Sequence, residues 1–361
     1  MKILQRVGVM NRGGQETLWM NFLRNCDRKD LQIDFLVKTD GGAYDKEISE
    51  LGSRVIFQGQ YRSRGILQWI ERIKLVADTI KNSGDYDVFH INTYLAIDAL
   101  CDVLSAKLAG IKTIVVHSHN SGGPHRLLQA FLRPVLNHMG IKKAACSDKA
   151  AKWMFGTEKN ILIINNGIDT QEFQMNQEIR NRIRNELDIK EDEVLIGHVG
   201  RFDDQKNHTF LIDIFYELSK INDKVKLLMV GRGTLENSIR KKVDKLGITD
   251  RVIFFGVSNK VSELMMAMDI FLFPSLYEGL PLVVVEAQSA GLKCFCSDTI
   301  SKDAIITDYV ISIPLSEDAY RWSSIIEEGL DYLRIDTNNI VAQKGFDISQ
   351  SIQQVKKLYL S

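Results

Sequence analysis

Two glutamates, Glu278 and Glu286, lie eight positions apart across a turn rich in glycine and proline. A strand is expected just before this turn and a helix just after it, beginning near Pro281. The backbone N–H groups of Gly279 and Leu280 would then be free, with the positive end of the helix dipole behind them, and this predicts an anion site. The alternative is that Glu278 only caps the helix and Glu286 is solvated. An isolated pair with this spacing would favour that alternative, but the preceding strand favours the anion site.

Arg201 and Lys206 could supply positive charge to such a site. Both follow Gly200, at the end of another expected strand. An arginine and a lysine five positions apart in a loop are usually solvated. Beside a glycine-rich turn and a helix terminus, however, the pair favours phosphate binding. No Asp-x-Asp pair follows a strand, and Asp203 and Asp204 are adjacent rather than spaced, so the sequence predicts no metal ion.

Two histidines, His117 and His119, end a further expected strand over residues 113–119. The two-residue period of a strand places both on one face, with Ser118 on the other. A lone histidine is more often a hydrogen-bonded structural residue than a catalytic one, and this interpretation is preferred for His117. A metal site is the other possibility for such a pair, but no third ligand with suitable spacing follows.

Short β-branched runs alternate with segments of helical period along the whole chain, which is typical of α/β proteins with parallel sheets. A charged segment, residues 178–193, separates two such series and marks the domain boundary. Two successive doubly wound units predict a ligand cleft between them. A helix with one buried face is expected over residues 66–80. The expected strands are residues 3–7, 32–37, 88–92, 113–119, 143–147 and 161–165, then 194–199, 225–230, 252–255, 270–273, 293–297 and 310–313.

Composition limits the function classes. The 361 residues are 45% hydrophobic and 25% charged, which predicts about two domains with full cores. The 46 basic and 46 acidic residues cancel, which argues against nucleic acid as the main partner. Residues 1–168 nevertheless carry 23 Lys and Arg against 16 Asp and Glu, whereas residues 169–361 carry 23 against 30. Five cysteines without a CxxC pair, an early charge at the start and no long apolar stretch indicate a cytoplasmic protein.

The segment from Glu278 to Glu286 resembles the E-x7-E signature of retaining glycosyltransferases with the GT-B fold, family 4 (glycosyl transferase group 1). Three further motifs carry the resemblance: Gly13-Gly14-Gln15-Glu16 is similar to the GGxE loop, Arg201 with Lys206 to the G-R-x4-K element, and Gly231-Arg232-Gly233 to the following G-x-G turn, where many relatives have Asp in place of Arg232. Asn166-Gly167-Ile168-Asp169 is similar to the family's connection between domains. Overall, the chain most resembles bacterial exopolysaccharide and capsule enzymes of the EpsF-like kind.

This resemblance implies two Rossmann-like doubly wound domains facing each other across a cleft. The N-terminal domain, 1–170, would bind the acceptor, and the C-terminal domain, 171–345, the nucleotide-sugar donor. A final helix, about 346–361, would pack back on the first domain. The enzyme would transfer a sugar with retention and without a metal, and it would need no cofactor. A UDP-sugar is the first choice of donor, although nothing in the sequence identifies the base.

The resemblance also assigns roles to residues. His119 matches an active-site histidine beside the transferred sugar. Arg201 and Lys206 would hold the diphosphate and, with the amides near Gly279, stabilise the charge that builds on the leaving phosphate. The carboxylate of Glu278 would bind sugar hydroxyls, and the donor-binding set is Gly13, Gly14, Gly231, Gly279, Leu280 and Glu286, the last of these at the ribose.

Basic residues in the first half are candidates for acceptor binding. Arg62 and Arg64 precede the helix that contains Trp69, and His125 and Arg126 follow the histidine strand. Such charges are usually solvated. Because the family's first domain binds the acceptor, they could instead hold a glycan or an anionic lipid-linked saccharide, or touch an acidic membrane at its inner face.

Three alternative functions fit the sequence less well. A sugar-nucleotide epimerase of the same fold would lack the combination of Gly13 and Gly14 with Glu278 and Glu286. A glycosyltransferase-like partner subunit without catalysis would not need every phosphate-contact candidate together with His119. A Rossmann dehydrogenase is disfavoured because residues 8–14 lack the G-x-G-x-x-G order.

Overall fold

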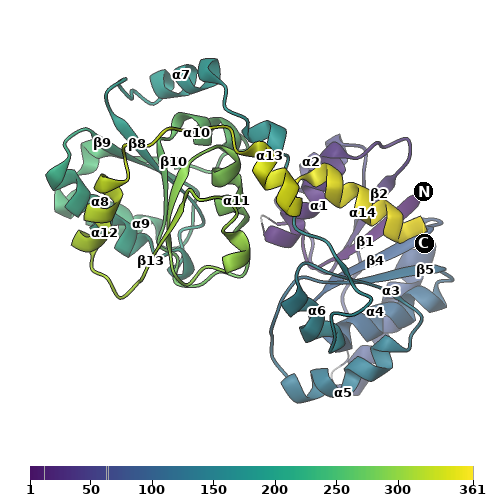
Figure 1. The fold of residues 1–361 in the computed structure, drawn as a ribbon. Coiled ribbons are helices and arrows are strands. Elements are labelled where there is room, and N and C mark those ends of the chain that lie inside the picture. Colours follow the sequence, from purple (N-terminus) through teal and green to yellow (C-terminus); the bar gives the residue numbers. More distant parts are fainter. Residues whose placement is uncertain (12, 62, 64, 361) are drawn as a thin grey trace. The chain divides into compact units, whose positions relative to one another are not determined.

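The computed structural model describes residues 1–11, 13–61, 63 and 65–360, which form two compact units. The N-terminal unit contains Met1–Gly167 together with the C-terminal segment from Ile348, and the C-terminal unit contains Ile168–Asp347. Each unit is a parallel sheet covered by helices (Figure 1). The predicted α/β class with doubly wound sheets is therefore confirmed.

The sheet of the N-terminal unit has the strand order β3-β2-β1-β4-β5-β6-β7, with every neighbouring pair parallel. The order reverses between β1 and β4, where parallel sheets bind ligands at the carboxyl ends of their strands. The elements are β1 (Lys2–Val7), α1 (Gly14–Asn25), β2 (Gln32–Val37), α2 (Asp45–Glu50), β3 (Val55–Phe57), α3 (Ile66–Ser83), β4 (Val88–Thr93), α4 (Ala96–Leu108), β5 (Thr113–Ser118), α5 (Arg126–Asn137), β6 (Lys142–Ala145), α6 (Asp148–Phe155), β7 (Leu162–Ile163) and α14 (Ile348–Leu360).

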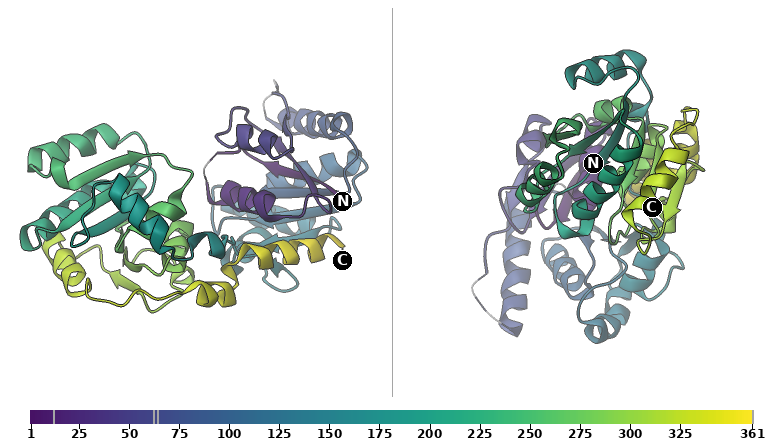
Figure 2. Two further views of the ribbon diagram at one scale, coloured as in Figure 1. Left: turned by 90° about the horizontal axis from the view of Figure 1, so that it is seen from above. Right: turned by 90° about the vertical axis from the view of Figure 1, so that its left-hand side faces the viewer.

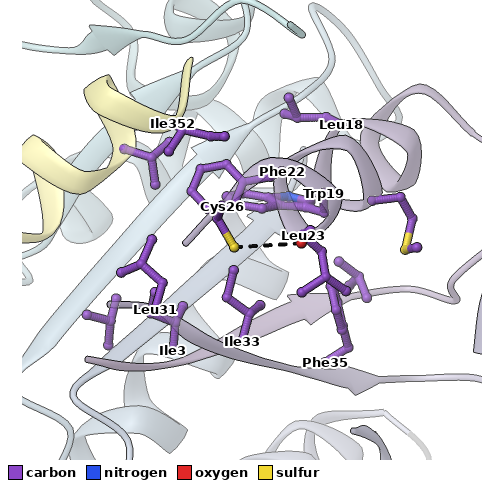
Figure 3. Packing of buried hydrophobic residues seen from close by; sticks show 14 of the residues in the cluster. Ile3, Leu18, Trp19, Phe22, Leu23, Cys26, Leu31, Ile33, Phe35 and Ile352 are labelled. Atoms are coloured by element: carbon purple, nitrogen blue, oxygen red, sulfur yellow. Dashed lines mark hydrogen bonds between the residues drawn. The ribbon is translucent and has the colours of Figure 1, made fainter. Parts of the chain in front are cut away.

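One face of this sheet packs against α1. The β-branched and aromatic residues of β1 and β2 are buried under one side of the helix, as the close view of this cluster shows (Figure 3). The buried side chains drawn there include Ile3, Ile33 and Phe35 of the sheet with Trp19 and Phe22 of the helix. Burial of large side chains of this kind stabilises a fold by about 1.5–3 kcal/mol each.

The last helix, α14, returns to the N-terminal unit and lies beside α1 (Figures 1 and 2). Its buried side chains Ile348, Ile352, Val355 and Tyr359 belong to the same core cluster. Helices α3, α4 and α5 bury a second cluster, which includes Val76, Val103 and Leu136. The sheet of the N-terminal unit therefore lies between two layers of helices.

The C-terminal unit repeats this plan with the strand order β10-β9-β8-β11-β12-β13, again parallel throughout. Its elements are η1 (Thr170–Phe173), α7 (Gln177–Glu186), β8 (Val194–Val199), η2 (Asp204–Lys206), α8 (His208–Ile221), β9 (Val225–Val230), α9 (Glu236–Leu246), η3 (Thr249–Arg251), β10 (Val252–Gly256), α10 (Val261–Ala267), β11 (Ile270–Phe273), α11 (Leu282–Ser289), β12 (Lys293–Ser297), η4 (Lys302–Ala304), β13 (Val310–Ile313), α12 (Ala319–Glu328), α13 (Asn338–Val341) and η5 (Ala342–Phe346). Here the order reverses between β8 and β11, so the turns that follow these two strands lie next to each other.

Four sequence expectations about the strands of the N-terminal sheet need correction. Strand β3 was not expected, because its apolar run, Val55–Phe57, is only three residues long and is not fully buried. Strand β5 ends at Ser118, so His119 lies just beyond the strand, and β6 ends at Ala145 rather than residue 147. The last strand of the N-terminal sheet, β7, has two residues instead of the five expected.

Candidate functional site

An ion pair lies where β8 and β11 end in the C-terminal unit. Lys206 Nζ is 2.6 Å from Glu278 Oε1, and the side chains are only 17% and 9% exposed. The ammonium group of Lys206 also lies 4.7 Å from the ring centre of Phe273, at the end of β11. The structure thus brings together two residues that are 72 positions apart in sequence. From the sequence, Lys206 was expected to hold the diphosphate and Glu278 to bind sugar hydroxyls.

Backbone hydrogen bonds hold the two turns in this arrangement. The N–H of Leu276 donates to the carbonyl of Gln205 at 2.8 Å, and Gln205 Nε2 donates to the carbonyl of Tyr277 at 3.0 Å. The main chain before Glu278 is therefore fixed against the main chain before Lys206. Glu278 does not cap α11, because Pro281 is the N-cap residue and no side chain bonds there. This excludes the capping alternative.

The turn between Glu278 and α11 leaves backbone open. A Cβ atom built on Gly279 would meet no heavy atom within 4 Å. Gly279 and Leu280 directly precede Pro281, at the positive end of α11. This is the arrangement that the sequence predicted for an anion site, with the ammonium of Lys206 added beside it.

Glu286 lies on α11 and is not a solvated helix residue. Burial, together with the smaller effect of the nearby charge of Glu172 on η1, raises the pKa of its carboxyl group to about 7. Glu172 itself accepts a hydrogen bond of 2.9 Å from Ser262 Oγ. Glu172 was not predicted as a site residue, because its closeness to Glu286 depends on η1 packing against α11. Asp169, which precedes η1, caps it by accepting from the N–H groups of Gln171 and Glu172.

Arg201 is less closely associated with this site than Lys206. Its side chain is 73% exposed, and its Nε donates to Asp203 Oδ2 at 2.7 Å. Asp203 Oδ1 in turn accepts from the N–H of Lys206 at 3.2 Å. Both oxygens of Asp203 are therefore engaged in shaping the loop.

Glycines bring the neighbouring loops close together. The backbone of Gly231 has φ +140°, and a Cβ there would lie 2.0 Å from the carbonyl oxygen of Gly200. The N–H of Gly200 also donates to the carbonyl of Val230 at 2.9 Å. Any side chain at Gly231 would push the loop of Arg201 away from β9.

We expect Gly231→Ala to destabilise the protein, whereas Gly279→Ala should leave its stability unchanged. The first substitution places a methyl group against a backbone oxygen at a strained φ, and such strain costs about 1–3 kcal/mol. The second meets open space in the free protein. Thermal melting compares their stabilities, and calorimetry with a nucleoside diphosphate compares binding. Gly279→Ala should weaken only the binding, and equal stability losses would contradict this distinction.

The N-terminal unit has a second glycine-rich helix start. Helix α1 begins at Gly14 after Gly13, which offers no side-chain cap. The carboxylate of Glu16 accepts from a backbone N–H of this first turn and occupies the space that a Cβ on Gly13 would take. Glu16 lies in the first helical turn, and burial raises the pKa of its carboxyl group. The positive end of α1 and the carboxyl end of β1 thus face the same loop.

His119 follows β5 and lies against His117, with ring centres 4.1 Å apart. His119 Nε2 lies 2.9 Å from Asn92 Oδ1 at the end of β4. Burial lowers the pKa of His119 to about 3, so the ring is neutral at physiological pH. His117 is fully buried and bonds His90, which agrees with the structural role preferred for it. Asn92 was not predicted as a site residue, although an asparagine at the carboxyl end of an expected parallel strand is a candidate for a ligand site.

The acceptor candidates are placed only in part. Arg62 and Arg64 lie outside the described residues. His125 precedes α5 in a left-handed backbone conformation with φ 58°, and both His125 and Arg126 are exposed. Their side chains are therefore available to a partner, and no contact ties them to His119.

The described parts of the chain contain neither a metal-binding cluster nor a membrane-spanning helix. No group of three or more His, Cys, Asp or Glu side chains there could hold a metal ion. Among the same residues, no helix is long and apolar enough to cross a membrane.

Comparison with known proteins identifies the family. Residues 179–328 match the model for glycosyl transferases group 1, and residues 12–172 match that for glycosyltransferase family 4. EpsF, named as a glycosyltransferase of Bacillus subtilis (strain 168), is 31% identical over 374 aligned positions, covering 99% of this chain and 96% of EpsF. The Escherichia coli UDP-Gal:alpha-D-GlcNAc-diphosphoundecaprenol alpha-1,3-galactosyltransferase is 24% identical, covering 76% of this chain and 75% of the relative.

A solved structure shares the complete fold. The Anabaena protein HepE, crystallised with UDP and glucose, superposes with a TM-score of 0.76 at 19% identity and covers 100% of both chains. The E-x7-E turn, the glycine-rich helix start and the two parallel sheets therefore agree with the family matches. The chain belongs to the GT-B glycosyltransferases of family 4 (glycosyl transferases group 1) and resembles EpsF along almost its entire length.

Proposed function

We propose that this glycosyltransferase moves a sugar from a nucleotide-sugar donor to a glycan or lipid-linked acceptor. A UDP-sugar is the first choice of donor, and the reaction belongs to exopolysaccharide, capsule or cell-envelope biosynthesis. The observation that carries the proposal is the Lys206–Glu278 ion pair beside the open backbone of Gly279. A diphosphate needs charge and free N–H groups, and both are present at one helix start. HepE in complex with UDP and the lipid-linked substrate in the name of the E. coli relative support the choice of substrates.

In this proposal the charged residues divide the work. Lys206, Arg201 and the amides of Gly279 and Leu280 hold the diphosphate and stabilise the negative charge that builds on the leaving phosphate. Glu278 binds sugar hydroxyls and Glu286 the ribose. Gly231 allows the close approach of the loops, the amides of Gly13 and Gly14 approach the donor phosphate at the start of α1, and His119 contacts the transferred sugar.

A thermal-shift screen with UDP, GDP and ADP tests the donor. A ligand at 100 times its dissociation constant stabilises the folded protein by about 2.7 kcal/mol, which a melting curve resolves. We expect UDP to raise the melting temperature most. A larger shift with another diphosphate would change the donor base, and no shift with any of them would contradict nucleotide binding at this site.

We expect transfer to be metal-independent and to retain the anomeric configuration. Lys206 and backbone N–H groups provide the charge stabilisation, and Asp203 is engaged with Arg201 and the N–H of Lys206. Turnover should therefore survive EDTA, and NMR of the product should show the anomer of the donor. Complete loss of transfer in EDTA with recovery in Mn²⁺ would overturn the metal-free assignment.

The transfer assay also distinguishes two alternatives, one enzymatic and one without catalysis. A sugar-nucleotide epimerase would change the donor without needing an acceptor, and a partner subunit without catalysis would bind nucleotide but leave the donor intact. We expect acceptor-dependent release of the nucleoside diphosphate.

We also infer that the N-terminal unit touches an anionic membrane surface, at the inner face of the membrane, through α5. Residues 103–147 contain six Lys and Arg and no Asp or Glu. On α5, Leu127, Phe131 and Val135 recur every fourth residue and are 90%, 76% and 49% exposed. An apolar stripe next to Arg126, in a segment without acidic residues, fits lipid chains and acidic headgroups.

Vesicle flotation tests this contact. Binding to vesicles that contain phosphatidylglycerol, but not to pure phosphatidylcholine, is expected, with loss of binding in Leu127→Ser/Phe131→Ser. Leu333→Ser, which changes a 79% exposed leucine of the C-terminal unit, is the matched control. Absence of binding, unchanged binding of the double variant, or a dimer that the double variant dissociates would contradict the membrane assignment.

A further inference from the structure

A chain of buried polar side chains runs through the N-terminal unit to His119. Gln5 of β1, His90 and Asn92 of β4, and His117 of β5 are each at most 7% exposed, and Tyr359 of α14 is 4% exposed. Trp19 of α1 joins them. Because buried polar atoms need partners, the direction of each hydrogen bond in this chain can be deduced.

The orientation of Asn92 is fixed from both sides. The indole N–H of Trp19 can only donate, and it lies 2.7 Å from Asn92 Oδ1, so this atom must be the amide oxygen. Asn92 Nδ2 donates to Gln5 Oε1 at 2.9 Å and to the carbonyl of Arg6 at 3.2 Å. Turning the amide over would place two N–H groups, or two oxygens, against each other.

This orientation determines the protonation of His119. Asn92 Oδ1 can only accept, so the contact of 2.9 Å requires the proton of the neutral His119 ring to lie on Nε2. The other ring nitrogen, Nδ1, then carries a lone pair. Nδ1 is buried and has no hydrogen-bond partner among the described residues, which costs free energy until a donor group reaches it.

The same argument shows that the unpaired ring nitrogen of His117 is a donor, whereas that of His119 is an acceptor. Gln5 Nε2 donates to the Tyr359 hydroxyl at 3.1 Å, and that hydroxyl then donates to His90 Nδ1 at 2.7 Å. His90 carries its proton on Nε2 and donates to His117 Nδ1 at 3.2 Å. His117 Nε2 is therefore protonated and cannot accept, so of these two neighbouring rings only His119 offers an acceptor.

We propose that Asn92 is a positioning residue that fixes His119 as the Nε2–H tautomer, so that His119 meets a hydroxyl group of the donor sugar through its acceptor atom, Nδ1. A hydroxyl that donates to Nδ1 gives this buried nitrogen the hydrogen-bond partner that it lacks. The oxygen of that hydroxyl keeps both of its lone pairs. The hydroxyl-bearing substrate rests on the proposed function, whereas the tautomer is a property of the free protein. The relay from Tyr359 to His117 prevents the neighbouring ring from taking the acceptor role.

Nitrogen NMR of the full-length protein labelled with ¹⁵N-histidine tests the proposal, with His119→Gln used to assign the signals. In the wild type we expect His119 to show a bare Nδ1 and a protonated, slowly exchanging Nε2. Asn92→Asp keeps the acceptor and should keep this proton on Nε2. Asn92→Leu should give averaged ring signals and lower kcat roughly tenfold, with unchanged affinity for the nucleoside diphosphate.

The matched control is Asn137→Leu, which removes another asparagine of the N-terminal unit whose Nδ2 donates to the carbonyl of Phe155. It should change neither the His119 signals nor kcat. A proton on Nδ1 in the wild type, or ring signals that Asn92→Leu leaves unchanged, would overturn the proposal. If Asn92→Leu does not fold, the wild-type spectrum alone decides. The spectrum needs no substrate, so failure of the proposed glycosyl transfer would be seen separately.

Discussion

Replacement of Lys206 by methionine is expected to lower turnover of the nucleotide-sugar donor by roughly 100- to 1,000-fold, the usual effect of removing one group that stabilises a developing negative charge. The side chain of Lys206 is only 17% exposed, so solvent cannot take over its role. Affinity for the nucleoside diphosphate should also fall. Steady-state kinetics and calorimetry measure the two effects.

Three further variants separate catalysis from stability. Glu278→Gln removes the negative charge 2.6 Å from Lys206, so diphosphate affinity should stay the same or rise while turnover falls. The double variant Lys206→Met/Glu278→Gln leaves no unpaired buried charge and should regain melting temperature without regaining turnover. Lys226→Met removes a comparably buried ion pair with Glu193, 3.1 Å long, and should leave turnover intact. Equal losses of turnover in Lys206→Met and Lys226→Met would contradict a role for Lys206 at the phosphate.

Glu286→Gln is expected to make the protein more stable above pH 7, by up to about 3 kcal/mol. Burial raises the pKa of Glu286 to about 7 from its usual 4.5, so between these values the folded protein holds a proton that the unfolded chain has lost. Wild-type stability therefore falls as the pH rises from 4.5 to 7, and this contribution then stays constant. Glutamine lacks the titration, so the two stability curves should converge near pH 4.5. Urea unfolding over pH 4.5–8.5 measures the difference.

Glu263 provides a control of opposite sign. A hydrogen bond from Arg182 lowers the pKa of Glu263, so its ionised form stabilises the fold and Glu263→Gln should reduce stability at neutral pH. The same Glu286→Gln variant should bind nucleoside diphosphate more weakly, by about 1.5–3 kcal/mol if the carboxylate accepts from the ribose. Parallel pH curves for wild type and Glu286→Gln would show that the carboxyl group is not desolvated.

Much of the fold could be predicted from local pattern. Strands β2, β8, β9, β11, β12 and β13 have the residues expected from their β-branched runs, and α14 spans the expected apolar period. Buried parallel strands are continuous apolar segments, so their ends are visible in the sequence. Strand β3 could not be found because its side chains are only partly buried, and the end of β5 was placed one residue late because His119 continues the alternation beyond the hydrogen-bonded ladder.

The sequence by itself determined the fold class, the family and the turns that carry Glu278, Gly279 and Gly13, because these depend on residues close together in the chain. Tertiary structure alone decided which charges meet. Lys206 pairs with Glu278 because β8 and β11 are neighbours in the sheet. Glu286 becomes hard to ionise because packing buries its carboxyl group and, to a smaller extent, because η1 brings Glu172 to α11. The tautomer of His119 depends on Trp19, Asn92 and Gln5, which three separate elements bring together. Hydrogen bonding and desolvation act over a few ångströms of space, whatever the distance along the chain, so no sequence pattern could reveal them.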